Sequence, residues 1–304
     1  MHLVETSELG HRYGRVRALR SVDLAVPEGS LYALLGPNGS GKTTLLQILM
    51  GLQRATFGEA KVLGRDVRSL RAVDRARIGY VAEGQRLPGW MTVRQLEAYL
   101  APLYESWDAT FAAELRRRFR LPADRSIGSL SRGEQMKAAL LCGLAPRPRL
   151  LVLDEPFTGM DALVKDELVS GLLESAGLEG SAVLLCSQDI GELELLADWV
   201  GMLDRGTLVF SEPMDRLRER YRRVEVMVGP GVEPATLRLP EQWLAAEWSG
   251  RRGGFLVTDA DVAPVEQAVA QWLPDVERLD VRPASLREVF VSVAKQRFAL
   301  EEVD

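Results

Sequence analysis

A glycine-rich segment near the N-terminus has the residue types and the spacing of a phosphate-binding loop. It lies between an apolar run at 31–35 and a helix-like run at 45–50, and it consists of Gly36, Pro37, Asn38, Gly39, Ser40, Gly41, Lys42, Thr43 and Thr44. The glycines let backbone N–H groups turn toward one anion, and the following helix directs its positive end at the same point. Lys42 can reach the β- and γ-phosphates, and the Thr43 hydroxyl can hold Mg²⁺. The segment therefore predicts binding of a nucleoside triphosphate.

Two carboxylates follow another apolar run. Asp154 and Glu155 come directly after residues 150–153 and before Pro156. Beside a phosphate loop, Asp154 is suited to orient Mg²⁺ or its water, and Glu155 is the candidate general base for the attacking water. An isolated Asp-Glu pair at a strand end more often caps a helix, but the phosphate loop upstream favours the catalytic interpretation. The sequence thus predicts hydrolysis as well as binding.

A pentapeptide about twenty residues before these carboxylates carries a specific resemblance. The sequence Leu-Ser-Arg-Gly-Glu at 130–134 heads a helix-like stretch. It resembles the Leu-Ser-Gly-Gly-Gln signature of ATP-binding cassette (ABC) ATPases, in which two cassettes pack head to tail. The signature of one cassette closes on the γ-phosphate held by the other. Ser131 and Gly133 match this pattern, whereas Arg132 replaces a glycine and Glu134 replaces a glutamine. The resemblance covers roughly residues 1–220 and implies that Ser131, Gly133 and Glu134 complete the ATP site of a second cassette, with ATP and Mg²⁺ as cofactors.

Other positions align with the family by their spacing. Tyr13 resembles the aromatic residue that stacks on adenine, and a core tyrosine is the alternative. Asp161, in the segment Gly159-Met160-Asp161, resembles part of the loop that joins the catalytic sites of two cassettes. We include both residues among the expected ATP-binding residues.

Two positions depart from the family pattern. Gln188 takes the place of a switch histidine that contacts the γ-phosphate, and its side chain can donate a hydrogen bond but carries no charge. Glu83 takes the place of a glutamine that contacts Mg²⁺. A carboxylate can ligate Mg²⁺ directly, but it adds negative charge beside the triphosphate. Either these changes are tolerated and Glu155 still supplies hydrolysis, or the site binds ATP and turns over slowly. Because Lys42 and the other site residues are present, we expect reduced but real ATPase activity.

The strands and helices expected around these residues indicate an α/β fold. Four short runs are apolar almost throughout, as buried parallel strands are: 31–35, 78–81, 150–153 and 182–186. Helix-like stretches alternate with them, which predicts a doubly wound core. The resemblance to the cassette family implies that this core is of the P-loop NTPase (RecA-like) type. A helical insert at about 85–145 interrupts this core. We expect a nucleotide-binding domain over 1–221 and a small accessory α+β domain over 222–304.

Composition narrows the function classes. The 304 residues are 46% hydrophobic with a net charge of −5, which argues against a broad nucleic-acid footprint, so no nucleic-acid partner is expected. Cys142 and Cys186 form no disulfide or metal-binding pattern, and the N-terminus does not have the pattern of a signal peptide. No run of eighteen apolar residues predicts a membrane span. If the protein works at a membrane, another chain must cross it.

The resemblance implies an ATP-binding subunit of a membrane transporter, cytoplasmic and peripheral on the inner face of the membrane. Two cassettes, as a homodimer or a heterodimer, would enclose two Mg-ATP molecules and act on a separate transmembrane permease. The segment 283–290 resembles the end of drug- and polysaccharide-exporter-like cassettes, which favours an exporter. A catalytically silent partner in a heterodimer and a non-transport cassette acting on ribosomes or DNA are the alternatives. Leu87, Trp90 and Met91 are either permease anchors or core residues of the helical insert.

Overall fold

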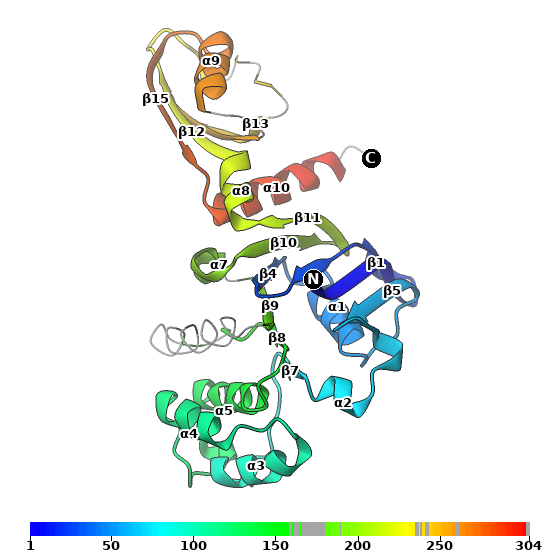
Figure 1. Cartoon of the computed structure of the whole chain (residues 1–304). Coiled ribbons are helices and arrows are strands. Elements are labelled where there is room, and N and C mark those ends of the chain that lie inside the picture. Colours follow the sequence, from blue (N-terminus) through cyan, green and yellow to red (C-terminus); the bar gives the residue numbers. More distant parts are fainter. Residues whose placement is uncertain are drawn as a thin grey trace. The chain divides into compact units, whose positions relative to one another are not determined.

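The computed structural model describes residues 1–157, 160, 165, 169, 180–188, 190–234, 237, 239–240, 243–258 and 262–301. The chain divides into two compact units, residues 1–211 and 212–304 (Figure 1). None of the helices in the described part of the chain is long and apolar enough to cross a membrane.

A six-stranded sheet forms the centre of the first unit. Its order is β11 (Thr207–Pro213), β10 (Trp199–Asp204), β4 (Leu31–Leu35), β9 (Ala182–Ser187), β8 (Leu150–Asp154) and β7 (Ile78–Val81). The strands from β10 to β7 are parallel, and every residue of β4, β8 and β9 is buried. The four strands expected from continuous apolar runs are confirmed, because a parallel strand buried on both faces has no polar side to show in its sequence.

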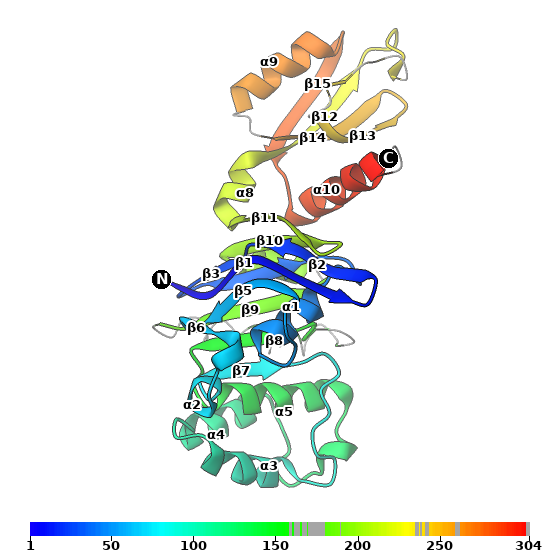
Figure 2. The same cartoon turned by 90° about the vertical axis from the view of Figure 1, so that its right-hand side faces the viewer.

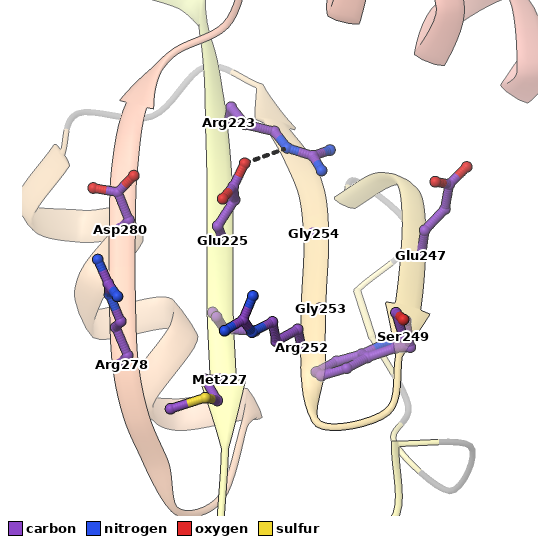
Figure 3. Close-up of a pocket in the computed structure, with 12 residues that line it drawn as sticks. Arg223, Glu225, Met227, Glu247, Ser249, Arg252, Gly253, Gly254, Arg278 and Asp280 are labelled. Atoms are coloured by element: carbon purple, nitrogen blue, oxygen red, sulfur yellow. Dashed lines mark ion pairs between the residues drawn. The ribbon is translucent and has the colours of Figure 1, made fainter.

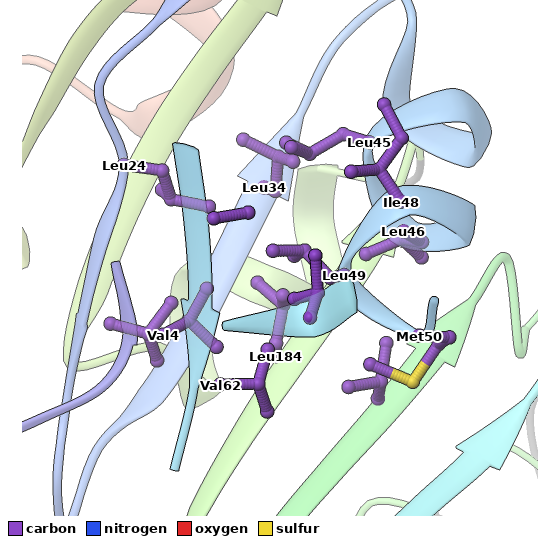
Figure 4. Packing of buried hydrophobic residues seen from close by; sticks show 14 of the residues in the cluster. Val4, Leu24, Leu34, Leu45, Leu46, Ile48, Leu49, Met50, Val62 and Leu184 are labelled. Carbon is purple, nitrogen blue, oxygen red and sulfur yellow. The ribbon is translucent and has the colours of Figure 1, made fainter. Parts of the chain in front are cut away.

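A second, antiparallel sheet packs with helix α1 (Lys42–Leu49) around a common core. Its order is β2 (Val16–Val22), β1 (His2–Tyr13), β5 (Phe57–Val62) and β6 (Arg65–Asp66), and β3 (Ala25–Pro27) pairs with β1. Figure 4 shows the apolar contacts that join these layers, formed by Val4, Leu24, Leu34, Leu45, Leu46, Ile48, Leu49, Met50, Val62 and Leu184. Since α1 buries one face in this core, the position of its N-terminus is fixed relative to β4.

A helical group lies beyond the β7 edge of the parallel sheet, as both views of the chain show (Figures 1 and 2). It contains α3 (Val93–Leu100), η2 (Ala101–Leu103), α4 (Ala109–Arg118), η3 (Ile127–Ser129) and α5 (Arg132–Leu144). The short elements η1 (Val67–Ser69) and α2 (Ala72–Arg75) precede β7, and α7 (Ile190–Leu196) follows β9. A capping box begins α3, since the Thr92 side chain accepts from the Gln95 amide and the Gln95 side chain accepts from the Thr92 amide.

The described part of the second unit contains a four-stranded antiparallel sheet and helices. The sheet order is β13 (Trp243–Ser249), β14 (Arg252–Thr258), β12 (Tyr221–Val228) and β15 (Val276–Pro283). The helices are α8 (Met214–Arg220), α9 (Val262–Trp272) and α10 (Leu286–Glu301). Apolar residues of one sheet face, including Val224 and Phe255, form a core with Val265 and Val269 of α9. The expected α+β character of this region is confirmed.

Candidate active site

Three neighbouring strands of the parallel sheet end at the candidate site. β9 lies between β4 and β8, with Ser187 in register with Leu35 of β4 and Cys186 in register with Asp154 of β8. The glycine-rich loop follows β4, Gln188 follows β9, and Glu155 follows β8. Ligands of open α/β sheets bind at the carboxyl ends of the strands, and these three segments meet at that edge.

The glycine-rich loop has a backbone that only glycine fits at several points. Gly39 and Gly41 have positive φ angles of 79° and 106°. A Cβ atom on Gly36 would lie 2.3 Å from the Leu203 carbonyl oxygen, and one on Gly41 would lie 2.5 Å from that of Ala18. Helix α1 then begins at Lys42 with no side-chain cap and no acidic residue in its first turn. Its first amides are therefore available to an anion.

Lys42 and Glu155 form a buried pair inside this loop. The Lys42 Nζ donates to the Gly36 carbonyl oxygen at 2.7 Å and lies 3.4 Å from Glu155 Oε1. The two side chains are only 6% and 7% exposed. Glu155 Oε2 accepts from the Ser187 hydroxyl at 3.3 Å and from the Gln188 amide at 3.2 Å. Glu155 has a φ of 49°, a left-handed conformation that is uncommon for non-glycine residues.

Asp154 is a buried carboxylate with unused hydrogen-bonding capacity. It is 1% exposed, and neither of its oxygens has a hydrogen-bond partner in the described part of the chain. Burial raises the pKa of Asp154, and the negative charges of Glu83 and Glu155 add to this, while Thr43 and Lys42 oppose it. An orphaned carboxylate beside the Thr43 side chain fits a hard divalent cation such as Mg²⁺. Among the described residues no cluster of three or more His, Cys, Asp or Glu side chains suits a metal.

A pocket of about 530 Å³ brings most of the expected residues together. Its walls include Tyr13, Asn38, Gly39, Ser40, Gly41, Lys42, Thr43, Thr44, Glu83 and Glu155. Gly36 and Pro37 lie in the same loop without lining the pocket. Tyr13 is 47% exposed, so it is not a core residue and its ring is available for stacking. The volume is in the range of small-molecule sites.

The pocket also contains residues that the sequence analysis did not identify. Arg17 and Arg20 come from β2, and Arg205 comes from the turn between β10 and β11. Their positive charges favour a polyanionic ligand. Arg17 and Arg20 lie close to Tyr13 in the sequence, so the expected adenine contact at Tyr13 could have identified them as pocket residues. Arg205 carries no such local signal, because its position depends on the pairing of β10 with β4.

The signature residues lie at the N-terminus of α5, apart from the phosphate pocket of the same chain. Ser131 is the N-cap, its side chain accepts from the Glu134 amide at 3.2 Å, and Glu134 Oε2 accepts from the Ser131 amide at 2.7 Å. The Ser131 amide lowers the pKa of Glu134, which keeps this carboxylate ionised. Ser131, Gly133 and Glu134 are absent from the walls of the phosphate pocket. Gln188 is exposed at the end of β9, whereas Asp161 lies outside the described residues.

Another pocket, of about 540 Å³, lies on the sheet of the second unit (Figure 3). Its charged side chains are balanced, with three arginines and three carboxylates: Arg223, Arg252, Arg278, Glu225, Glu247 and Asp280. No glycine-rich loop and no helix N-terminus are among its lining residues. It therefore lacks the features that make the first pocket suitable for a triphosphate.

Comparisons with known proteins agree with this geometry. A family model described as ABC transporter matches residues 19–158. The daunorubicin resistance ATP-binding protein DrrA2 of Streptomyces coeruleorubidus is 32% identical, over 97% of this chain and 96% of that protein. The aliphatic sulfonates import ATP-binding protein SsuB 1 of Xanthomonas axonopodis pv. citri is 36% identical, over 70% and 86% respectively. A solved structure described as the ATP binding subunit of an ABC transporter has a TM-score of 0.65 at 25% identity, over 71% of this chain and 92% of that one.

Proposed function

The chain belongs to the ABC transporter family, and from this premise we propose that it is the ATP-hydrolysing subunit of an exporter-type transporter. The buried arrangement of Lys42, Asp154 and Glu155 beneath the phosphate loop carries this proposal. The exporter assignment is supported by the match to the drug-resistance protein DrrA2, which covers 97% of this chain and 96% of that protein. Import proteins are also similar to this chain, with matches over 70% and 90% of its length.

Hydrolysis follows from the way the site residues are held. The triphosphate binds to the loop amides and the N-terminus of α1, and its negative charge draws the Lys42 ammonium from Gly36 and Glu155 toward the β- and γ-phosphates. Glu155 then accepts a proton from the water that attacks the γ-phosphorus. Mg²⁺, when bound, neutralises phosphate charge, and the Thr43 hydroxyl and the Asp154 carboxylate would hold it, with Glu83 on the same pocket wall. Tyr13 stacks on the adenine ring.

A second cassette completes the site. The signature residues do not line the phosphate pocket of their own chain, so another copy or a related cassette supplies Ser131, Gly133 and Glu134 to the γ-phosphate. Closure on ATP and reopening after hydrolysis give two states of the pair with different affinity for the nucleotide. Transport would use this difference to move a separate transmembrane permease.

Trp90 is the candidate anchor for that permease. It is 77% exposed, whereas Met91 is buried in the helical group and Leu87 is half-buried. A large exposed aromatic side chain is typical of binding hot spots. Contact there would place the chain on the cytoplasmic face of the membrane, where ATP is available.

Co-purification from detergent-solubilised membranes tests the partner and the activity together. The parent chain is expected to retain a polytopic membrane protein and to hydrolyse ATP in that complex. Trp90→Ser should weaken retention of the membrane protein, while Trp272→Ser, which changes an exposed tryptophan of the second unit, should not. Equal retention by both variants would contradict the proposed contact.

A catalytically silent subunit is the second candidate, and the exposed, uncharged side chain of Gln188 favours it. Loss of one well-placed donor to the γ-phosphate costs on the order of a hundredfold in rate by analogy with other transition-state donors. Gln188→His is therefore expected to hydrolyse ATP faster than the parent. A variant that is no faster would indicate that the substitution is already compensated.

A further inference from the structure

The end of β9 supplies a hydrogen bond to the proposed catalytic base. We propose that Ser187 is a positioning residue, which orients the Glu155 carboxylate for the hydrolysis proposed above; the inference rests on that function. Ser187 is the last residue of β9, is 1% exposed, and donates its hydroxyl proton to Glu155 Oε2 at 3.3 Å. Because β9 lies between β4 and β8, this hydroxyl is fixed between the phosphate loop and the strand that carries Glu155.

The two oxygens of Glu155 have different partners. Oε1 faces Lys42 at 3.4 Å, and Oε2 accepts from Ser187 and from the Gln188 amide. The contact with Lys42 is lost when phosphate groups draw the ammonium away, whereas neither Ser187 nor Gln188 lines the phosphate pocket. Oε2 therefore stays anchored, and Oε1 becomes the oxygen that faces the reacting water.

The two carboxylate oxygens of Glu155 therefore have different roles in hydrolysis. Oε1 accepts a proton from water while the water oxygen forms a bond to the γ-phosphorus, and the bond from that phosphorus to the bridging oxygen of ADP breaks. ADP and inorganic phosphate are the products. Ser187 keeps its own proton and acts only through the orientation of Glu155.

The side chain at position 188 is not needed for this anchoring. Gln188 contributes its main-chain amide, which any residue except proline would supply. Its side chain is exposed. Among the described residues, Ser187 is thus the one whose side chain donates to Oε2.

Steady-state kinetics of variants of the full-length chain test the proposal. Ser187→Ala should lower kcat by about tenfold to a hundredfold, the range expected for losing a hydrogen bond to a charged group. KM for MgATP, the Kd for MgATP and Tm should change little, and Ser187→Thr should retain most of the rate. The matched control is Ser181→Ala. Ser181 lies just before β9, and its buried hydroxyl donates to the Pro148 carbonyl oxygen. Its kcat should equal that of the parent.

A double-mutant cycle separates positioning from general packing. In a Glu155→Gln background, Ser187→Ala should not lower the residual rate further, because residues that act as a unit are not additive. An equal loss in both backgrounds would overturn the proposal, as would parental kcat in Ser187→Ala. In the latter case the proposed function still stands if the parent exceeds Glu155→Gln. A parent that is no faster than Glu155→Gln would overturn the proposed function and this inference together.

Discussion

Asp154→Asn should make the free chain more stable while it removes the response to Mg²⁺. The Asp154 carboxylate is buried with no hydrogen bond of normal geometry, and Thr43 and Lys42 offset only part of the cost of burying its charge. A buried charge that is poorly compensated costs more than a buried amide of the same shape. We expect a gain of about 1–2 kcal/mol in the free energy of unfolding. For a unit of this size, that corresponds to a rise in Tm of about 2–8 °C without ligand.

The pH dependence of the difference in Tm between Asp154→Asn and the parent is a second test. The pKa of Asp154 is raised by burial, so its ionised form destabilises the folded state, and this cost disappears as the pH falls through the raised pKa. The difference in Tm between the variant and the parent should be widest near neutral pH and should close in acid. Asp198→Asn is a control for stability at a fixed pH, since the Asp198 carboxylate accepts from the Leu31 amide at 2.8 Å and the substitution should not make the chain more stable.

Thermal unfolding with ATP tests whether Asp154→Asn removes the response to Mg²⁺. A ligand at a hundred times its Kd stabilises the folded state by about 2.7 kcal/mol, and in the parent this gain should be larger with Mg²⁺ than with EDTA. In Asp154→Asn the two conditions should give nearly the same Tm. A variant that is less stable than the parent without ligand, or that keeps the full Mg²⁺ response, would refute this account of Asp154.

Three further substitutions address other parts of the site. Tyr13→Ala should raise the Kd for ATP by about fivefold to a hundredfold, because it removes one aromatic stacking contact, while Tm stays unchanged. A fluorescence titration that finds the same Kd for both proteins would exclude stacking. Lys42→Ala should lower the free energy of unfolding by about 3 kcal/mol because it leaves Glu155 buried without its cation, and adding Glu155→Gln should restore much of this in chemical denaturation. Glu134→Gln should strengthen ATP-induced dimerisation in analytical ultracentrifugation, because it removes a negative charge at the N-terminus of α5, and weaker dimerisation would contradict this reasoning.

The sequence was most informative where structure is determined locally. β4 and β7 begin and end where their apolar runs do, because strands buried on both faces need continuous apolar sequence. The glycine-rich loop is similarly local, since positive φ angles at Gly39 and Gly41 require glycine. By contrast, β1 is half-exposed and carries several register shifts, so its twelve residues do not show a clean alternation.

The parts of the site that the sequence did not reveal depend on contacts between distant segments. Arg205 reaches the pocket because β10 pairs with β4, and Ser187 reaches Glu155 because β9 lies between β4 and β8. Neither residue stands in a recognisable motif. Lys42 and Glu155 each stand in a motif, but their contact at 3.4 Å could not be predicted because it joins residues from two different strand ends.

Steady-state ATPase activity of the parent chain and of Glu155→Gln, measured in the complex with the membrane partner, tests the central claim most directly. The substitution removes the carboxylate and keeps its shape, so both proteins should bind MgATP with similar affinity. The parent should hydrolyse ATP well above the rate of Glu155→Gln, even if slowly. Equal rates for the two proteins would contradict it and would leave ATP binding without hydrolysis.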